Sequence, residues 1–185
     1  MHNKGLTLIE VIVVMAIIVI ITVAIGFDLT VWNRNYAVER QMKELYSDLT
    51  NARMSAMQRN RMYFVSLTSG QYTVYEDTNP APDGNGTLEV ADRQVLQTQL
   101  GTRYPITWDP ITISGSRINF TTRGISNVDV TKTGAICSNI DSNADINCIQ
   151  ISASRIKMGQ LKTTIPNGGA CVATTDPTTT NCVAK

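Results

Sequence analysis

The sequence predicts an α+β fold in which one long N-terminal helix packs on an antiparallel β-sheet head. Three observations predict this class. A largely apolar run from Leu6 to Phe27 is followed by an apolar stripe at helical spacing. Short β-rich runs separated by turn residues begin at Met62, and four cysteines lie in the last third of the chain. Helix and strands are therefore segregated along the sequence, which is the pattern of an α+β protein.

The apolar run is long enough to cross a bilayer. Its 22 residues, from Leu6 to Phe27, would span about 33 Å as a helix, close to the thickness of the hydrocarbon layer. A cleaved secretory signal has a shorter apolar core, and a plain signal anchor leaves Glu10 unexplained. An ionisable residue inside such a segment is costly, so Glu10 is a functional candidate. Lys4 precedes the run, which predicts a cytoplasmic N-terminus and an external head.

The hexapeptide Gly5-Leu6-Thr7-Leu8-Ile9-Glu10, followed by the apolar run, resembles the class III signal peptide of type IV pilins and type II secretion pseudopilins. The resemblance implies that a prepilin peptidase cuts between Gly5 and Leu6 and methylates the new amine, although leucine stands where the family usually has phenylalanine. Residues 1–5 would then be a leader, and residues 6–27 a transmembrane helix that becomes the filament core. Glu10 would act in assembly, because a carboxylate can neutralise the Leu6 amine of a neighbouring subunit.

A second helical segment is predicted at residues 28–61. Apolar side chains recur there at alternating steps of four and three, which places them on one face, while charged side chains occupy the other faces. The helix should end near Asn60, and residues 26–28 are a candidate kink between the two halves. The stripe consists of Val38, Met42, Leu45, Leu49, Ala52 and Ala56.

The remaining chain divides into a β-rich head at residues 62–162 and an irregular tail at residues 163–185. The runs 62–67 and 72–75, separated by Thr68-Ser69-Gly70-Gln71, predict a hairpin. The tail is rich in Thr, Gly, Asn and Pro and would not form a core alone. Further strands are predicted at residues 94–100, 111–113, 117–121, 148–152 and 155–158, and the chain between Gly124 and Cys148 is expected to be irregular.

The four cysteines, Cys137, Cys148, Cys171 and Cys182, predict two disulfides, because their number is even and the head is directed out of the cytoplasm. Local pairing of sequence neighbours is the simplest connectivity, and the two other pairings stay open. A zinc site is the weaker interpretation, since no C-x-x-C spacing occurs and the single histidine, His2, lies in the leader.

The order of these segments resembles the GspH/FimT family of minor pilins and pseudopilins. The likeness rests on a helix ending over residues 51–60, a hairpin, the loop at residues 75–79, and Ile118-Asn119-Phe120 leading into Gly124. It implies a structural subunit that primes or caps assembly of a type IV pilus or a type II secretion pseudopilus. A disulfide-bonded tail favours the pilus side.

The same resemblance implies the partners and the location. The partners would be other minor and major pilins or pseudopilins, the prepilin peptidase, the membrane and an inner-membrane assembly platform. The chain would cross the inner membrane once with its head in the periplasm, and after assembly it would belong to a periplasmic or extracellular filament.

Two further groups of polar residues are candidate binding sites. Asp77, Asn79 and Asp83 offer oxygen ligands of the kind that calcium prefers, although turn formation is the favoured account of this loop. Arg155, Lys157 and Lys162 make the C-terminal part of the chain basic, at the place where some family members carry a DNA-binding Gly-Arg-x-Arg segment. Their default interpretation is a solvated strand face, and a DNA-binding minor pilin for DNA uptake is the alternative function.

Composition argues against several other function classes. The net charge of +1 gives no global field for nucleic acid. No histidine follows the leader, and the chain has neither a Gly-x-Ser-x-Gly motif nor a phosphate-binding loop, so we expect no enzymatic activity and no cofactor. A membrane-anchored β domain without any filament role is the remaining alternative.

Overall fold

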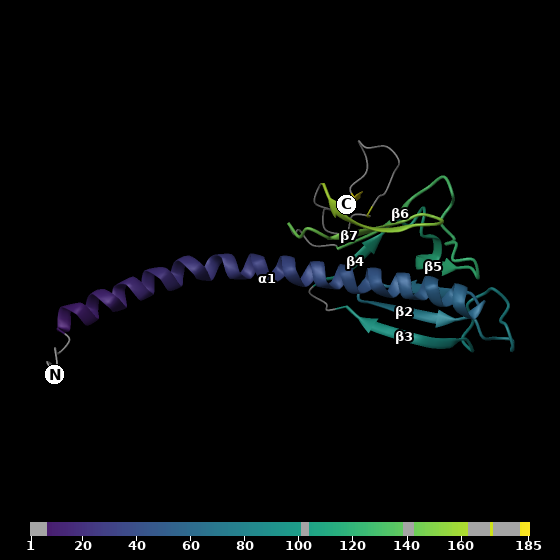
Figure 1. Cartoon of the computed structure of the whole chain (residues 1–185), viewed down its shortest axis with the longest axis horizontal. Helices are drawn as coiled ribbons and strands as arrows, with labels where there is room; N and C mark the ends of the chain where they lie inside the picture. The colour runs from purple at the N-terminus through teal and green to yellow at the C-terminus, as the bar shows by residue number, and fades with distance from the viewer. Residues whose placement is uncertain (1–6, 101–103, 139–142, 163–170, 172–181) are drawn as a thin grey trace.

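One long helix and two antiparallel sheets make up the protein. The computed structural model describes residues 7–100, 104–138, 143–162, 171 and 182–185, and for residues 23–28 it describes the backbone only. The helix α1 (Leu8–Arg59) projects far beyond the head with its N-terminal half, and its C-terminal half lies along the two sheets (Figure 1). The α+β prediction, with a helix packed on an antiparallel head, is confirmed.

The ends of α1 are defined by two capping residues. Thr7 is the N-cap, and its side chain accepts a hydrogen bond from the backbone N–H of Glu10. Asn60 ends the helix in the left-handed conformation, with φ of 52°, and its N–H bonds to the carbonyl of Ala56. The helix is therefore about 78 Å long, and its backbone continues across residues 26–28, where a kink was expected.

The first sheet contains the predicted hairpin. Thr68 closes the turn, because its N–H and its hydroxyl both donate to the carbonyl of Gln71, each over 2.9 Å. The strands β1 (Tyr63–Leu67), β2 (Gln71–Glu76), β3 (Arg93–Gln99) and β5 (Arg117–Phe120) pair in the order β3-β2-β1-β5.

The second sheet carries the cysteines. Its strands β4 (Ile106–Trp108), β6 (Gly134–Ser138), β7 (Cys148–Ile151), β8 (Ile156–Leu161) and β9 (Cys182–Ala184) pair in that order, every pair antiparallel. A short 3-10 helix, η1 (Ser114–Ser116), leads from the β4 side into β5 of the first sheet.

The core lies where α1 meets both sheets. Every residue of the predicted helical stripe, from Val38 to Ala56, is buried, and apolar side chains from both sheets pack against the stripe in one cluster. A partly buried hydrogen bond ties the helix to the first sheet, since the hydroxyl of the buried Tyr72 donates to Asp48 Oδ2 over 2.6 Å. The second half of α1 is thus fixed to the head, and the first half is not.

Two strand predictions were wrong. Residues 111–113 form a turn, because Asp109 accepts the N–H of Ile111 and the hydroxyl of Thr112, and its carbonyl accepts the N–H of Ile113. The stretch expected to be irregular contains β6, all five residues of which are buried, so its sequence shows no alternation of apolar and polar residues. The strands β4 and β9 were not predicted.

Candidate assembly surface

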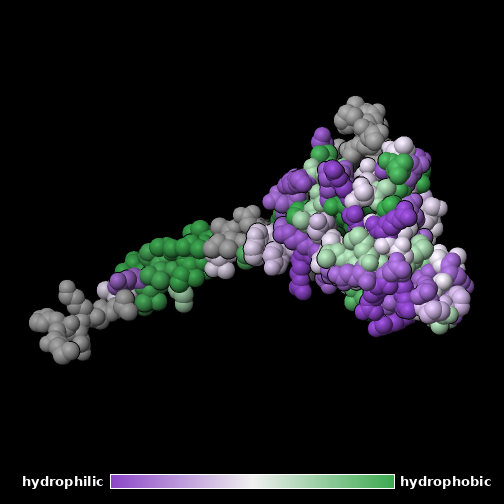
Figure 2. Space-filling view, turned by 45° about the vertical axis from the view of Figure 1, so that its right-hand side comes forward, coloured by the Kyte–Doolittle hydropathy of each residue, from purple (hydrophilic) through white to green (hydrophobic). Residues whose placement is uncertain are grey.

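Apart from Glu10 and Thr22, residues 8–22 of α1 are apolar on all sides of the helix, and all of them are exposed. Large aliphatic side chains from Leu8, which is 79% exposed, to Ile21, which is 51% exposed, cover this part of the helix (Figure 2). A helix that is hydrophobic all round is stable only when something else covers it, such as lipid or other helices. Within the part of the chain that the structure describes, no helix is both long and apolar enough to cross a membrane.

Glu10 lies in the first turn of this apolar half. Its backbone N–H donates to the carbonyl of Thr7 over 3.1 Å and to the Thr7 hydroxyl over 3.4 Å. A carboxylate in the first turn of a helix is near the positive end of the helix dipole. The side chain is exposed, as are its neighbours Ile9 and Val11. The predicted processing residues Gly5 and Leu6 lie outside the described residues.

The two disulfides are present, but they do not join sequence neighbours. Cys137 pairs with Cys171 and Cys148 with Cys182, each across 34 positions, so the local pairing is wrong and one of the two open alternatives is formed. Cys137 and Cys148 stand opposite each other on β6 and β7. Because both side chains project from the same face, each can meet a cysteine of the tail, and the four form one buried cluster.

Gly159 makes room for the second disulfide. It lies on β8 between Cys148 on β7 and Ala184 on β9. A Cβ at this position would lie 2.5 Å from the carbonyl oxygen of Val183 and 3.1 Å from the Sγ of Cys182. Only glycine lets β9 approach this closely, and the Cα atoms of Cys148 and Cys182 are 6.0 Å apart.

The loop that offered calcium ligands is organised by its own hydrogen bonds. Asp77 is buried, and its two oxygens accept the N–H groups of Asn85 over 3.1 Å and Gly86 over 2.6 Å. Gly84 adopts φ of 80°, and a Cβ there would collide with the Asp77 carboxylate. The Asn79 side chain donates to Glu89, and Asp83 is exposed. Among the described residues, no group of three or more His, Cys, Asp or Glu side chains is arranged to hold a metal ion.

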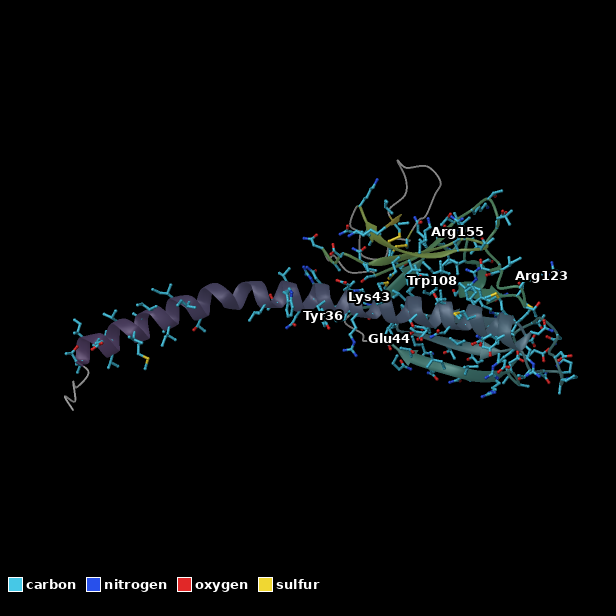
Figure 3. All side chains as sticks on the ribbon, viewed as in Figure 1. Tyr36, Lys43, Glu44, Trp108, Arg123 and Arg155 are labelled. Carbon is cyan, nitrogen blue, oxygen red and sulfur yellow. A yellow bond between two sulfur atoms is a disulfide. The ribbon has the colours of Figure 1, made fainter. Side chains whose placement is uncertain are left out.

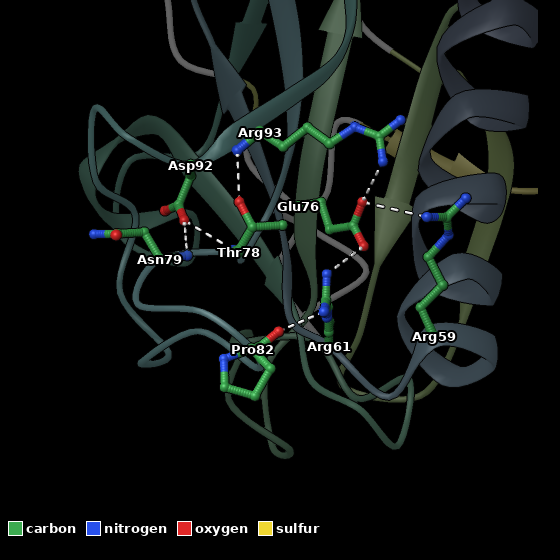
Figure 4. A network of polar contacts seen from close by, with 8 residues as sticks. All are labelled: Arg59, Arg61, Glu76, Thr78, Asn79, Pro82, Asp92 and Arg93. Carbon is green, nitrogen blue, oxygen red and sulfur yellow. Dashed lines mark hydrogen bonds and ion pairs between the residues drawn. The ribbon is translucent and has the colours of Figure 1, made fainter.

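A buried glutamate at the far end of the head was not predicted. Glu76 is 1% exposed and faces three guanidinium groups at 3.4–3.5 Å (Figure 4). Arg61 also donates to the carbonyl of Pro82. These contacts join the end of α1 to β2 and β3, since the three partners are Arg59, Arg61 and Arg93.

The predicted basic group is only partly brought together. Arg155 and Lys157 line a polar hollow of about 220 Å³ with Gln150 and Ser152, and Figure 3 shows Arg155 on the side of the head opposite β3. Lys162 follows the end of β8 and does not line this hollow. It lies five residue steps beyond Lys157, which corresponds to about 16 Å along a strand. The structure therefore presents two adjacent cations and a separate third.

Two family models match this chain, and they cover different parts of it. The model of the prokaryotic N-terminal methylation motif matches residues 1–26, so the chain belongs to the class of proteins that carry this motif. The model described as type II transport protein GspH matches residues 41–154, more than half of the chain. The protein belongs to the GspH family of minor pseudopilins. The family's description names type II transport, so it does not support the preference for a pilus that the tail suggested.

Two solved structures that resemble this chain are of a minor pseudopilin from a type II secretion system. A crystal structure of the minor pseudopilin EpsH from the type II secretion system of Vibrio cholerae aligns with a TM-score of 0.47 and 10% identity, covering 67% of this chain and 94% of that one. A second structure of EpsH from Vibrio cholerae gives a TM-score of 0.46 and 11% identity, covering 65% and 94%. The comparison with curated proteins found no match.

Proposed function

We propose that this protein is a minor pseudopilin that joins the filament of a type II secretion system through its N-terminal helix and there primes or caps assembly. Membership of the GspH family supports this class of subunit. The priming or capping role rests on the resemblance to minor subunits, which start or end a filament. Its partners in this account are other pseudopilins and the inner-membrane platform that assembles them.

One observation carries the proposal: half of α1 projects from the head as an apolar rod with a single carboxylate near its tip. Burying one large aliphatic side chain is worth roughly 1.5–3 kcal/mol. The exposed residues from Leu8 to Ile21 therefore supply a strong drive to pack against lipid or against like helices. In the filament, the rods of neighbouring subunits would bury one another.

In the proposed function, Glu10 aligns the helix of one subunit with the helix of its neighbour in the filament. Once the chain is cut after Gly5, the Leu6 amine is positively charged, and an unpaired charge among packed apolar helices is expensive. A carboxylate from the adjacent subunit removes that cost only when the two helices are correctly aligned. The methylation motif over residues 1–26 supports this processing. Before assembly, residues 6–27 would lie in the inner membrane with the head in the periplasm.

The test compares two carboxylate-to-alanine variants on one helix. Glu10→Ala should stay in the membrane fraction at normal levels and lose most of its incorporation into sheared filaments, measured by quantitative immunoblot. Glu39→Ala is the control, because Glu39 only pairs with Lys43 on the helix surface at 2.6 Å, and it should incorporate normally. Normal incorporation of Glu10→Ala would contradict the pairing mechanism.

The DNA-binding alternative has less support. Arg155 and Lys157 together could neutralise about two phosphates, which gives weak binding with a shallow dependence on salt. A gel-shift titration of the purified head in a salt series separates the two functions. Absence of binding at low salt rejects DNA uptake, whereas specific binding that Arg155→Gln abolishes would favour it over a purely structural role.

A further inference from the structure

We infer that Trp32 and Tyr36 form an aromatic anchor that holds α1 at the lipid–water boundary of the membrane, on the side of the head. This inference rests on the proposed function, because it assumes that the apolar half of α1 resides in a bilayer before assembly. Its ligand is the headgroup region of a phospholipid bilayer. Both residues lie between the segments that the two family models match, 1–26 and 41–154.

The geometry of the pair is the first argument. The two rings stack with centroids 5.9 Å apart and planes inclined by 17°, yet Trp32 is 63% and Tyr36 60% exposed. Stacked aromatic rings that remain exposed offer a large amphipathic surface for a partner outside the chain. Indole and phenol rings combine an apolar body with a polar group, and they concentrate at membrane interfaces for that reason.

The order of chemistries along this face is the second argument. Leu29, Trp32 and Tyr36 follow one another at steps of three and four, so they share a face, and Arg40 and Lys43 continue it. The face changes from aliphatic to aromatic to charged over 14 residues, or about 21 Å. The membrane changes in the same order, from the hydrocarbon layer through the headgroups to water.

Tyr36 lies in open surroundings that include charged and amide side chains, which suits headgroups better than acyl chains. Tyr36 borders a hollow of about 620 Å³ between the helix and the end of β3, lined also by Arg40, Gln41 and Tyr104. Figure 3 shows Tyr36 on the helix just before it enters the head. The first buried residue of the stripe is Val38, so the head begins immediately above the anchor.

The anchor also fixes the depth of Glu10. Trp32 lies 22 residue steps beyond Glu10, which is about 33 Å along a helix. The hydrocarbon layer is about 30 Å thick. With Trp32 at the periplasmic boundary, the Glu10 carboxylate therefore reaches the cytoplasmic boundary instead of the apolar centre. The carboxylate can then stay hydrated while the subunit resides in the membrane. It loses its water only when it pairs with the amine of a neighbouring subunit in the filament.

Fluorescence of the full chain in vesicles tests the anchor. The protein has two tryptophans, Trp32 and Trp108, so Trp108→Phe leaves Trp32 as the single reporter. In vesicles of phosphatidylethanolamine and phosphatidylglycerol, its emission should shift to the blue. Lipids brominated near the headgroup should quench it more than lipids brominated near the chain ends. Trp32→Phe, which leaves Trp108 in the head, is the control and should not respond to either lipid.

Carbonate extraction, measured on the same vesicles, separates the possible failures. If the chain resists extraction while Trp32 is quenched by acrylamide and by neither lipid, the anchor is wrong. The proposed insertion of α1 into the membrane before assembly is then still supported. Stronger quenching by the deep bromines places Trp32 inside the hydrocarbon and also rejects the anchor. If carbonate releases the chain, the membrane stage of the proposed function fails, and the anchor fails with it.

Discussion

Single buried polar residues connect the helix to the sheets. Tyr72 is buried, and its hydroxyl donates to Asp48 on α1 over 2.6 Å. Burial raises the pKa of Tyr72 above its ordinary value of 10.0, and the hydrogen bond to Asp48 raises it further. The folded state therefore holds the phenol proton more tightly than the unfolded chain does.

This linkage predicts loss of stability at alkaline pH. Because the folded pKa of Tyr72 is raised, its contribution is complete below about pH 10 and disappears as the pH rises above that value. The free energy of unfolding can be measured by urea titration from about pH 8 to about pH 11. With rising pH it should fall more steeply for the native chain than for Tyr72→Phe. Parallel pH profiles for the two proteins would contradict this assignment.

Glu76 is the second residue whose loss should be costly. Its carboxylate is shared by three arginines, and removing the charge leaves those guanidinium groups to repel one another around a buried amide. Glu76→Gln should lower the free energy of unfolding by about 2–3 kcal/mol. Glu39→Gln, which breaks the surface pair with Lys43, should cost less than about 1 kcal/mol. Equal effects of the two changes in urea titrations would count against a special role for Glu76.

At the scale of elements, the two disulfides link the strands β6, β7 and β9 and Cys171 of the tail. Each disulfide joins residues 34 positions apart, and cross-links of that span stabilise a fold by about 4 kcal/mol in the loop-entropy account. Reduction should therefore remove amide protection from β6 to β9 and leave the hairpin of β1 and β2 protected, because the hairpin packs on α1. Uniform loss of protection in hydrogen exchange would contradict this division.

The connectivity has its own test. In Cys148→Ser the thiol left without a partner should be Cys182, identified by alkylation and peptide mass mapping. Local pairing would instead release Cys137. The stability measurement and this mapping are independent. If the mapping shows the expected pairing but reduction changes the stability little, only the expected stabilisation by the disulfides is wrong.

Elements with a strong period could be predicted from the sequence, and elements without one could not. The stripe from Val38 to Ala56 repeats at helical spacing, and all of its members are buried. The strand β6 is buried on both faces and has four small residues around Ile136, so its sequence shows no alternation of apolar and polar residues. The strand β4 is three residues long between Pro105 and Pro110, too short to be recognised by pattern.

The candidate sites differ in the same way. Glu10 is visible in the sequence because one carboxylate interrupts an apolar run. The partners of Glu76 are distant in the chain, at residues 59, 61 and 93, so no local pattern marks them. Four cysteines allow three pairings, and sequence spacing favours a pairing that the fold does not use. Contacts that depend on the tertiary arrangement were therefore the ones that sequence reasoning missed.

At the scale of the whole molecule, the protein is a fixed head on an apolar rod. The C-terminal half of α1 is built into the core of the head, and the N-terminal half projects with its side chains exposed (Figures 1 and 2). The head folds around its own core. In the proposed function, the rod would therefore exchange lipid for neighbouring helices without disturbing that core.

The most direct test of this account is the N-terminal and intact mass of the protein purified from its native host. The account predicts a chain that begins at Leu6 and carries a methyl group on its N-terminal amine, with both disulfides intact. A chain that retains Met1 to Gly5, or one cut near Ala24, would contradict the central claim. It would leave Glu10 without a charged partner and return the protein to an anchored or secreted β domain.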